Sequence, residues 1–362
     1  MTEQRQRAVL VGAGGFGADL LRALYESPRL AVAGVSDRDP GAAEDAAAQA
    51  GCPAYADKRQ LLAETDPQAV FVALPPAPAA DVVALAGRRG AAVWRAAPVG
   101  RDLPEAVALC RIATPPGPGR PTPQFTVGTQ RRFMGGYRHA KGLLPDLGQV
   151  YLVQAQYLFN WGEDLGWRGG RAAGGGAMME LGYPMVDLVV WLLGLPESVA
   201  CSAGRQHRGA GGPDRPVYDS DDTAVAVLRY RDQTTATVTV SRCFNPISEY
   251  LALYADGGSI LAGPNACTLR DRDGVAIDRF SEDVPPTEVF ARQVDAFATA
   301  VADGAARYAC SGWENLLTLA TIDAAYLSDQ TGQPESPGVL LANEDLRPAD
   351  CLRATPIEGS AQ

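Results

Sequence analysis

Histidine is nearly absent from this chain, which has two in 362 residues, at positions 139 and 207. Two histidines cannot build a metal site that needs several imidazoles. The seven cysteines are an odd number, widely scattered and without a C-x-x-C pair, which excludes the zinc and redox sites that use such pairs. We therefore expect reduced, mostly buried cysteines and no metal site.

Basic runs and long apolar runs are missing as well. Lys and Arg number 32 against 42 Asp and Glu, a net charge of -10, and no basic run is present that could follow the phosphates of a nucleic acid. No apolar run reaches the roughly 18 residues that a bilayer span needs. The first residues lead directly into an expected strand, without the apolar core of a signal peptide. We expect no nucleic-acid or membrane partner, and cytoplasmic residence.

Short apolar runs alternate with helical segments in the first third of the chain. Residues 8–12, 30–37, 69–74 and 91–96 are expected as strands, and residues 16–25, 40–50, 79–89 and 103–114 as helices. This alternation is typical of a doubly wound parallel sheet of the Rossmann type. The sequence therefore predicts an α/β dinucleotide-binding fold for the N-terminal domain.

A segment with five prolines and two glycines, residues 114–124, interrupts this pattern, and we place the domain boundary there. Beyond it, residues 149–159, 223–230 and 235–242 alternate apolar and polar residues, as antiparallel strands with one covered face do. Helices are expected at 178–193, 288–302 and 313–328. The predicted domains are a Rossmann domain at 1–124, an α+β domain with a mostly antiparallel open sheet at 125–332, and a tail at 333–362.

The glycines after the first strand form a G-x-G-x-x-G pattern at Gly12, Gly14 and Gly17. The first glycine permits the tight turn, the second lets backbone approach a pyrophosphate, and the third lets helix pack close to strand. Asp37 ends the second strand and would bind the adenosine ribose, which favours NAD over NADP. Arg38 beside it could pair with the extra phosphate of NADP. A glycine turn without a ligand is the alternative.

The segment from Gly174 to Gly194, GGGAMMELGYPMVDLVVWLLG, resembles the signature of the glucose-fructose oxidoreductase, inositol dehydrogenase and MocA family, which reads G-G-G-x-L-x-D-x-G-x-H-x-x-D-x-x-x-W-L-x-G. Matches continue in SDRDP at 36–40, ALPPAP at 73–78, APVG at 97–100 and GTQRRF at 128–133. The resemblance implies a nicotinamide cofactor and substrates that are sugars, cyclitols or related polar alcohols. It adds Phe16, Leu74, Pro75 and Pro98 to the expected cofactor contacts.

Three ionisable residues of that family are replaced here. Ala97 stands in place of its lysine, Pro184 in place of its histidine, and Ala79 in place of a further histidine. Proton transfer would then need other groups. Glu180 and Tyr183 share one flank of a helix, and the resemblance points that flank at the nicotinamide, so they are the predicted catalytic residues. Core packing for Tyr183 and an arginine partner for Glu180 are the alternatives.

The resemblance also places a substrate cleft around several large or charged side chains. The predicted substrate-binding residues are Arg131, Arg132, Trp161, Trp167 and Arg168. The two tryptophans could instead form only the floor of the pocket.

The function expected from these features is an NAD(P)-dependent oxidoreductase that acts on a sugar, a cyclitol or an imine-like biosynthetic intermediate. Two alternatives remain open. One is an enzyme that oxidises its substrate transiently to permit elimination, epimerisation or glycoside cleavage, and the other is a non-catalytic relative that binds a dinucleotide or sugar. The resemblance suggests that the open sheet of the second domain packs against a second copy of the chain, and its exposed half-apolar face would need such cover, so we expect a homo-dimer or homo-tetramer.

Overall fold

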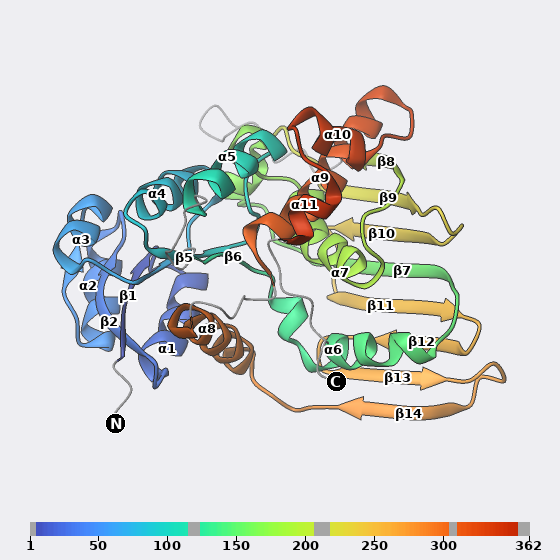
Figure 1. Cartoon of the computed structure of the whole chain (residues 1–362), viewed down its shortest axis with the longest axis horizontal. Helices are drawn as coiled ribbons and strands as arrows, with labels where there is room; N and C mark the ends of the chain where they lie inside the picture. The colour runs from blue at the N-terminus through green and yellow to red at the C-terminus, as the bar shows by residue number, and fades with distance from the viewer. Residues whose placement is uncertain (1–4, 115–123, 206–217, 304–309, 354–362) are drawn as a thin grey trace.

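Two β-sheets lie side by side, with helices packed against each (Figure 1). The structure, a computed structural model, describes residues 5–114, 124–205, 218–303 and 310–353. The segment 115–123, which makes up most of the expected domain boundary, and the segment 206–217 lie outside the described residues.

The N-terminal sheet is wholly parallel, with strand order β3-β2-β1-β4-β5-β6. Its strands are β1 (Gln6–Val11), β2 (Leu30–Ser36), β3 (Ala54–Tyr55), β4 (Ala69–Val72), β5 (Ala92–Ala96) and β6 (Phe125–Gly128). Its helices are α1 (Phe16–Glu26), α2 (Pro40–Ala50), α3 (Lys58–Thr65), α4 (Pro76–Arg88) and α5 (Leu103–Ala113). The strand order reverses between β1 and β4, and ligands of such sheets bind at the carboxyl ends of the strands there.

The parallel sheet continues past the expected domain boundary at residue 124, because β6 pairs with β5. A helix from late in the chain, α8 (Pro286–Asp303), also packs against α1. Phe297 of α8 contacts Phe71 of β4 edge to face, with ring centroids 5.3 Å apart. One core of the N-terminal domain is thus completed by a distant segment, a contact that local sequence pattern does not carry.

The C-terminal sheet has strand order β14-β13-β12-β11-β7-β10-β9-β8 and is antiparallel except for the pair β7 and β10. Its strands are β7 (Val150–Leu158), β8 (Ser198–Gly204), β9 (Thr223–Arg229), β10 (Thr235–Ser241), β11 (Ser248–Ala255), β12 (Gly258–Ala262), β13 (Ala266–Arg270) and β14 (Ala276–Ser281). Helices α6 (Gly135–Leu143), α7 (Tyr183–Leu193) and α9 (Gly312–Thr331) pack on it. This is the mostly antiparallel open sheet that the sequence predicts.

The helix expected at 178–193 has two parts, which corrects the prediction of one regular helix. Met178–Gly182 is a π-helical turn, and α7 follows it from Tyr183. The reason is Pro184, which has no N–H for the carbonyl of Glu180 four residues earlier and whose ring would clash with it. The helix widens there instead, as π-turns at functional sites often do.

One helical stretch among the described residues, Arg171–Leu193, is long and apolar enough to cross a membrane by length and composition. Glu180 and Asp187 interrupt it, so no continuous apolar run marks it in the sequence. Of its apolar window 72% is buried inside the protein, which is the burial of a core helix.

Part of the expected C-terminal tail is folded, which corrects that prediction. Helices α10 (Pro337–Asn343) and α11 (Pro348–Arg353) pack on α9. Leu341 and Cys351 supply their fully buried side chains. The short apolar patches of this segment lack a long period, so the sequence does not reveal these helices.

Candidate active site

The glycine loop between β1 and α1 is shaped by contacts that exclude side chains. Gly12 has φ 97°, and a Cβ there would lie 2.4 Å from the carbonyl oxygen of Ala73. A Cβ on Gly17 would lie 2.0 Å from the carbonyl oxygen of Gly12. Gly14 has no neighbour within 4 Å of its Cβ position, and it lines a cavity on each side. The loop is thus open where a pyrophosphate would approach and closed where helix meets strand, so these residues fit a dinucleotide.

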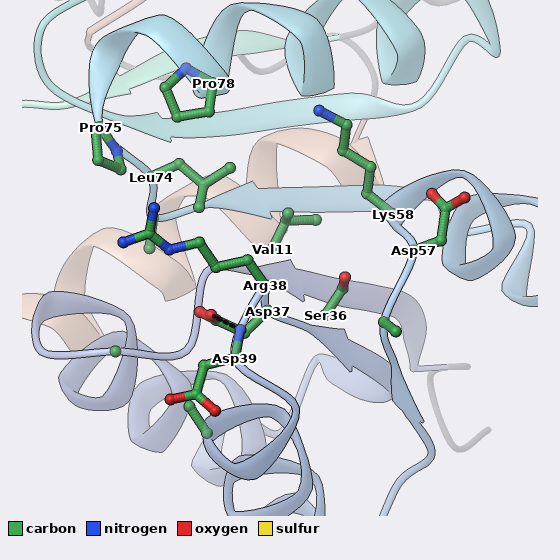
Figure 2. A pocket seen from close by; sticks show the side chains of 14 residues that line it. Val11, Ser36, Asp37, Arg38, Asp39, Asp57, Lys58, Leu74, Pro75 and Pro78 are labelled. Atoms are coloured by element: carbon green, nitrogen blue, oxygen red, sulfur yellow. Dashed lines mark hydrogen bonds between the residues drawn. The ribbon is translucent and has the colours of Figure 1, made fainter. Parts of the chain in front are cut away.

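The first cavity, of about 600 Å³, lies at the carboxyl end of β2. Asp37 is fixed there, since its carboxylate accepts hydrogen bonds from the backbone N–H of Ala13 at 2.7 Å and of Asp39 at 2.9 Å. Figure 2 shows Arg38 reaching across the cavity towards Leu74 and Pro75. Lys58, at the start of α3, lines the opposite side (Figure 2); sequence reasoning missed this cation because α3 itself was not predicted.

The second cavity, of about 540 Å³, adjoins the first along Gly14, Ala73, Leu74 and Pro75. Most of the predicted site residues line it: Phe16, Leu74, Pro75, Pro98, Arg131, Trp161, Trp167, Arg168, Glu180 and Tyr183. Ala97 and Pro184, at the positions where the resemblance led us to expect a lysine and a histidine, line it too. Among the described residues around this cavity, Glu180 is the one carboxyl, and no lysine or histidine is present.

Glu180 lies in the π-turn, and its side chain is 7% exposed. Its Oε1 is 2.9 Å from Nε of Arg168, and its Oε2 is 3.7 Å from Nη1 of Arg242. Burial raises the pKa of this carboxyl to about 7, although the two guanidinium groups act in the opposite direction. A carboxyl with that pKa both gives and takes a proton near neutral pH, as an acid-base catalyst must.

Arg242 is a site residue that the sequence did not reveal. It follows β10 directly, is 3% exposed, and donates to the carbonyl of Arg168 and to Oγ of Ser220. No motif marks it, because its partners come from three separate segments of the chain.

Tyr183 lies in the cavity wall, but its hydroxyl is committed to protein groups. It accepts a hydrogen bond from the N–H of Val99 at 3.2 Å and donates to Oδ1 of Asn315 at 3.0 Å. The side chain is 1% exposed, and burial raises its pKa well above the usual value. The hydroxyl therefore holds the loop after Pro98 in place and is unsuited to release a proton near neutral pH.

The two adjacent arginines expected at the cleft lie in different environments. Arg131 lines the second cavity, stacks over Tyr157 at 4.7 Å, and pairs with Glu249. Arg132 is instead 4% exposed and forms a buried ion pair with Asp187 at 2.8 Å and a second pair with Glu314. Arg132 is not among the residues that line this cavity. Its two ion pairs connect it to α7 and to α9.

No group of three or more metal-ligating side chains occurs among the residues that the structure describes.

Comparison with protein families gives two consecutive matches. Residues 6–117 match the model of an oxidoreductase family with an NAD-binding Rossmann fold, named GFO_IDH_MocA. Residues 137–261 match the GFO/IDH/MocA C-terminal domain. Together these matches cover most strands of both sheets, whereas β6, β13 and β14 lie outside them.

Two curated proteins illustrate the relation. A D-xylose 1-dehydrogenase (NADP(+)) of Haloferax volcanii is 26% identical over 340 residues, covering 89% of this chain and 97% of its own. The rhizopine catabolism protein MocA of Rhizobium meliloti is 27% identical over 244 residues, 67% of this chain and 73% of its own.

Solved structures share the fold. Levoglucosan dehydrogenase in complex with NADH and levoglucosan aligns with a TM-score of 0.82 at 17% identity, covering 92% of this chain and 99% of that one. An oxidoreductase domain protein from Kribbella flavida aligns with a TM-score of 0.84 at 23% identity, covering 92% and 99%.

Proposed function

Because this chain belongs to the GFO/IDH/MocA family of NAD-binding oxidoreductases, we propose that it interconverts an alcohol and a carbonyl, or an amine and an imine, on a small sugar-like or cyclitol-like substrate, with Glu180 as the proton donor and acceptor. One observation carries the assignment of Glu180. Among the described residues of the second cavity it is the one carboxyl, in a place without lysine or histidine, and its pKa of about 7 suits the role.

The dinucleotide supplies a hydride acceptor or donor when bound. Reduction of a carbonyl then leaves its oxygen in need of a proton, and Glu180 gives it; oxidation runs in reverse, with Glu180 taking the hydroxyl proton. Arg168 and Arg242 stabilise the ionised form of this buried carboxyl, since both lie within 4 Å of it. Trp161 and Trp167 provide apolar faces of the kind that pack on sugar rings.

The cofactor that fits the first cavity is NAD. Asp37 is held by two backbone amides, so it cannot turn away from a ribose without leaving both donors unpaired. A 2'-phosphate would lie against that fixed negative charge. Arg38 extends towards Leu74 and Pro75 (Figure 2), where a guanidinium can cover an adenine ring.

A second copy of the chain is the partner that the C-terminal sheet fits. The strand registers place Val225, Tyr254 and Leu261 on the face opposite to the buried Val238 and Leu251. These three side chains are 42%, 43% and 56% exposed, and an apolar sheet face of this kind is typical of an interface. Light scattering should report a dimer or tetramer. Leu261→Glu should shift the oligomeric state towards monomer.

The test of the function is direct. Absorbance of the reduced nicotinamide should change when the protein is mixed with NAD and a panel of sugars, sugar acids and cyclitols, or with NADH and the matching carbonyl compounds. Glu180→Gln should bind the cofactor with unchanged affinity and turn over far more slowly. If neither NADH nor NADPH quenched the fluorescence of the protein, the proposal would be contradicted.

A further inference from the structure

The two arginines of the second cavity differ in what their guanidinium groups already bind. Arg131 donates from Nε and Nη2 to the two oxygens of Glu249, at 3.2 and 2.9 Å. These two donors are therefore already occupied by a carboxylate of the protein. Arg168 contacts a carboxylate through its Nε, which lies 2.9 Å from Oε1 of Glu180. Neither of its terminal nitrogens hydrogen-bonds to any described residue, and the side chain lines the cavity.

Arg168 is held in a fixed orientation by its neighbours. Its guanidinium carbon lies 4.1 Å from the ring centroid of Trp161 and 4.9 Å from that of Trp167. Its backbone carbonyl accepts hydrogen bonds from Arg242 at 2.8 Å and Ser220 at 2.9 Å. Both indole rings thus lie within cation–π distance of the guanidinium, and such contacts leave the in-plane N–H donors of a guanidinium able to bind an anion.

We propose that the free end of the Arg168 guanidinium binds a carboxylate of the substrate, so that the substrate is a carboxylated sugar or polyol. The inference rests on the proposed function, since it names the substrate class of the same cavity. A planar fork of two NH₂ groups matches the two oxygens of a carboxylate, which is the geometry of the strongest arginine hydrogen bonds.

The surrounding charges favour a single negative charge at this place. Arg168 and Arg242 both lie within 4 Å of the one carboxylate of Glu180. The buried carboxylate of Asp221 already accepts hydrogen bonds from Tyr326 and the N–H of Met178 and lies 3.9 Å from Arg171. Two guanidinium groups thus lie beside the carboxylate of Glu180, which favours the binding of an anion next to Arg168.

Binding an anion on Arg168 also affects the neighbouring acid. The added negative charge offsets the guanidinium that favours ionised Glu180, so Glu180 holds its proton more firmly in the loaded site. Protonated Glu180 is the form that donates to a carbonyl oxygen. Substrate recognition and readiness for reduction are thereby coupled through one arginine.

The test uses substrate pairs that differ in one group: D-glucose with D-glucuronate, and D-galactose with D-galacturonate, together with D-glucose 6-phosphate as a tetrahedral anion. Each compound is measured for kcat/KM with NAD, and for binding to the protein loaded with cofactor, from the fluorescence of the tryptophans beside Arg168. The variants are Arg168→Gln, Arg168→Lys and, as a matched surface control, Arg231→Gln, whose side chain is 89% exposed.

The wild type should bind the carboxylates at least about 10-fold more tightly than the neutral sugars, as expected for hydrogen bonds to a charged group. Arg168→Gln should reduce that ratio to about one, Arg168→Lys should keep part of it, and Arg231→Gln all of it. The wild type should also prefer glucuronate to the phosphate.

Preference for the neutral member, preference for the phosphate, binding of none of the compounds, or an unchanged ratio in Arg168→Gln would each overturn the proposal. A change in cofactor affinity without a change in the substrate ratio would assign Arg168 to the dinucleotide instead. Turnover of neutral sugars alone would leave the proposed oxidoreductase function standing, and binding without turnover would leave the carboxylate site standing.

Discussion

Pro184 follows Glu180 by four residues and denies its carbonyl the N–H that a regular helix would supply, at the point where the helix widens into a π-turn. Pro184 thus reshapes the backbone that carries the one carboxyl found in the described wall of the cavity. We expect Pro184→Ala to let the turn tighten towards a regular helix and move the carboxyl. The variant should fold at least as stably as the wild type in thermal melts, while kcat falls about 10- to 100-fold. An unchanged kcat would show that the π-turn does not position Glu180.

Tyr183 offers a test of positioning against catalysis. Tyr183→Phe removes the acceptor of the Val99 N–H and the donor to Asn315. The free energy of unfolding should fall by about 1–3 kcal/mol, because buried partners lose their hydrogen bonds. The pH at which kcat changes should stay where it is in the wild type. A lost or displaced pH dependence in Tyr183→Phe would instead make the hydroxyl a proton carrier.

Asp37 should set the choice of cofactor. Asp37→Asn keeps the shape of the side chain but removes the charge that opposes a 2'-phosphate, so the ratio of the dissociation constants of NADPH and NADH should move at least about 10-fold towards NADPH. Fluorescence titration measures both constants. Wild-type protein that already binds NADPH more tightly than NADH would overturn the assignment of NAD and give Arg38 and Lys58 the dominant role.

Glu180 should make stability depend on pH in a defined direction. Its pKa is raised from 4.5 to about 7 in the folded protein, so ionising it costs stability; this cost is absent below pH 4.5, grows as the pH rises and is complete above pH 7. The amide side chain of the Glu180→Gln variant does not ionise, so the variant does not pay this cost at any pH. From pH 4 to pH 8 the unfolding free energy of Glu180→Gln relative to wild type should rise by on the order of 3 kcal/mol.

Chemical denaturation at the two pH values measures this difference. Asp323, whose pKa is also raised to about 7 by burial, is present in both proteins and cancels. A relative stability that does not depend on pH would mean that Glu180 ionises in the folded protein as it does in the unfolded chain.

Local sequence pattern was sufficient for the elements whose signals are local. The glycine loop, its strand and Asp37 follow one another within a single βαβ unit, and the alternating strands of the second sheet show their period directly. The pattern failed where a distant partner decides the structure: α8 completes the first core, and Arg132 enters the core only because Asp187 and Glu314 neutralise it.

The candidate site divides in the same way. Motif positions led to Glu180, Arg168 and both tryptophans, whereas Arg242 and Lys58 come from segments without a motif. Tyr183 lines the same cavity as Glu180. The hydrogen-bond partners of its hydroxyl could not be predicted from the sequence, since Val99 and Asn315 lie 84 and 132 residues away along the chain.

The pH dependence of kcat/KM for carbonyl reduction, compared between wild type and Glu180→Gln, tests the central claim most directly. Protonated Glu180 is the required form in that direction, and kcat/KM reports ionisation of the unloaded site, so the wild-type kcat/KM should fall as the pH rises through about 7. Glu180→Gln should lose about 10²- to 10⁴-fold in kcat and show no such fall. A Glu180→Gln variant with wild-type kcat and the same pH profile would contradict the assignment of Glu180 as the proton donor.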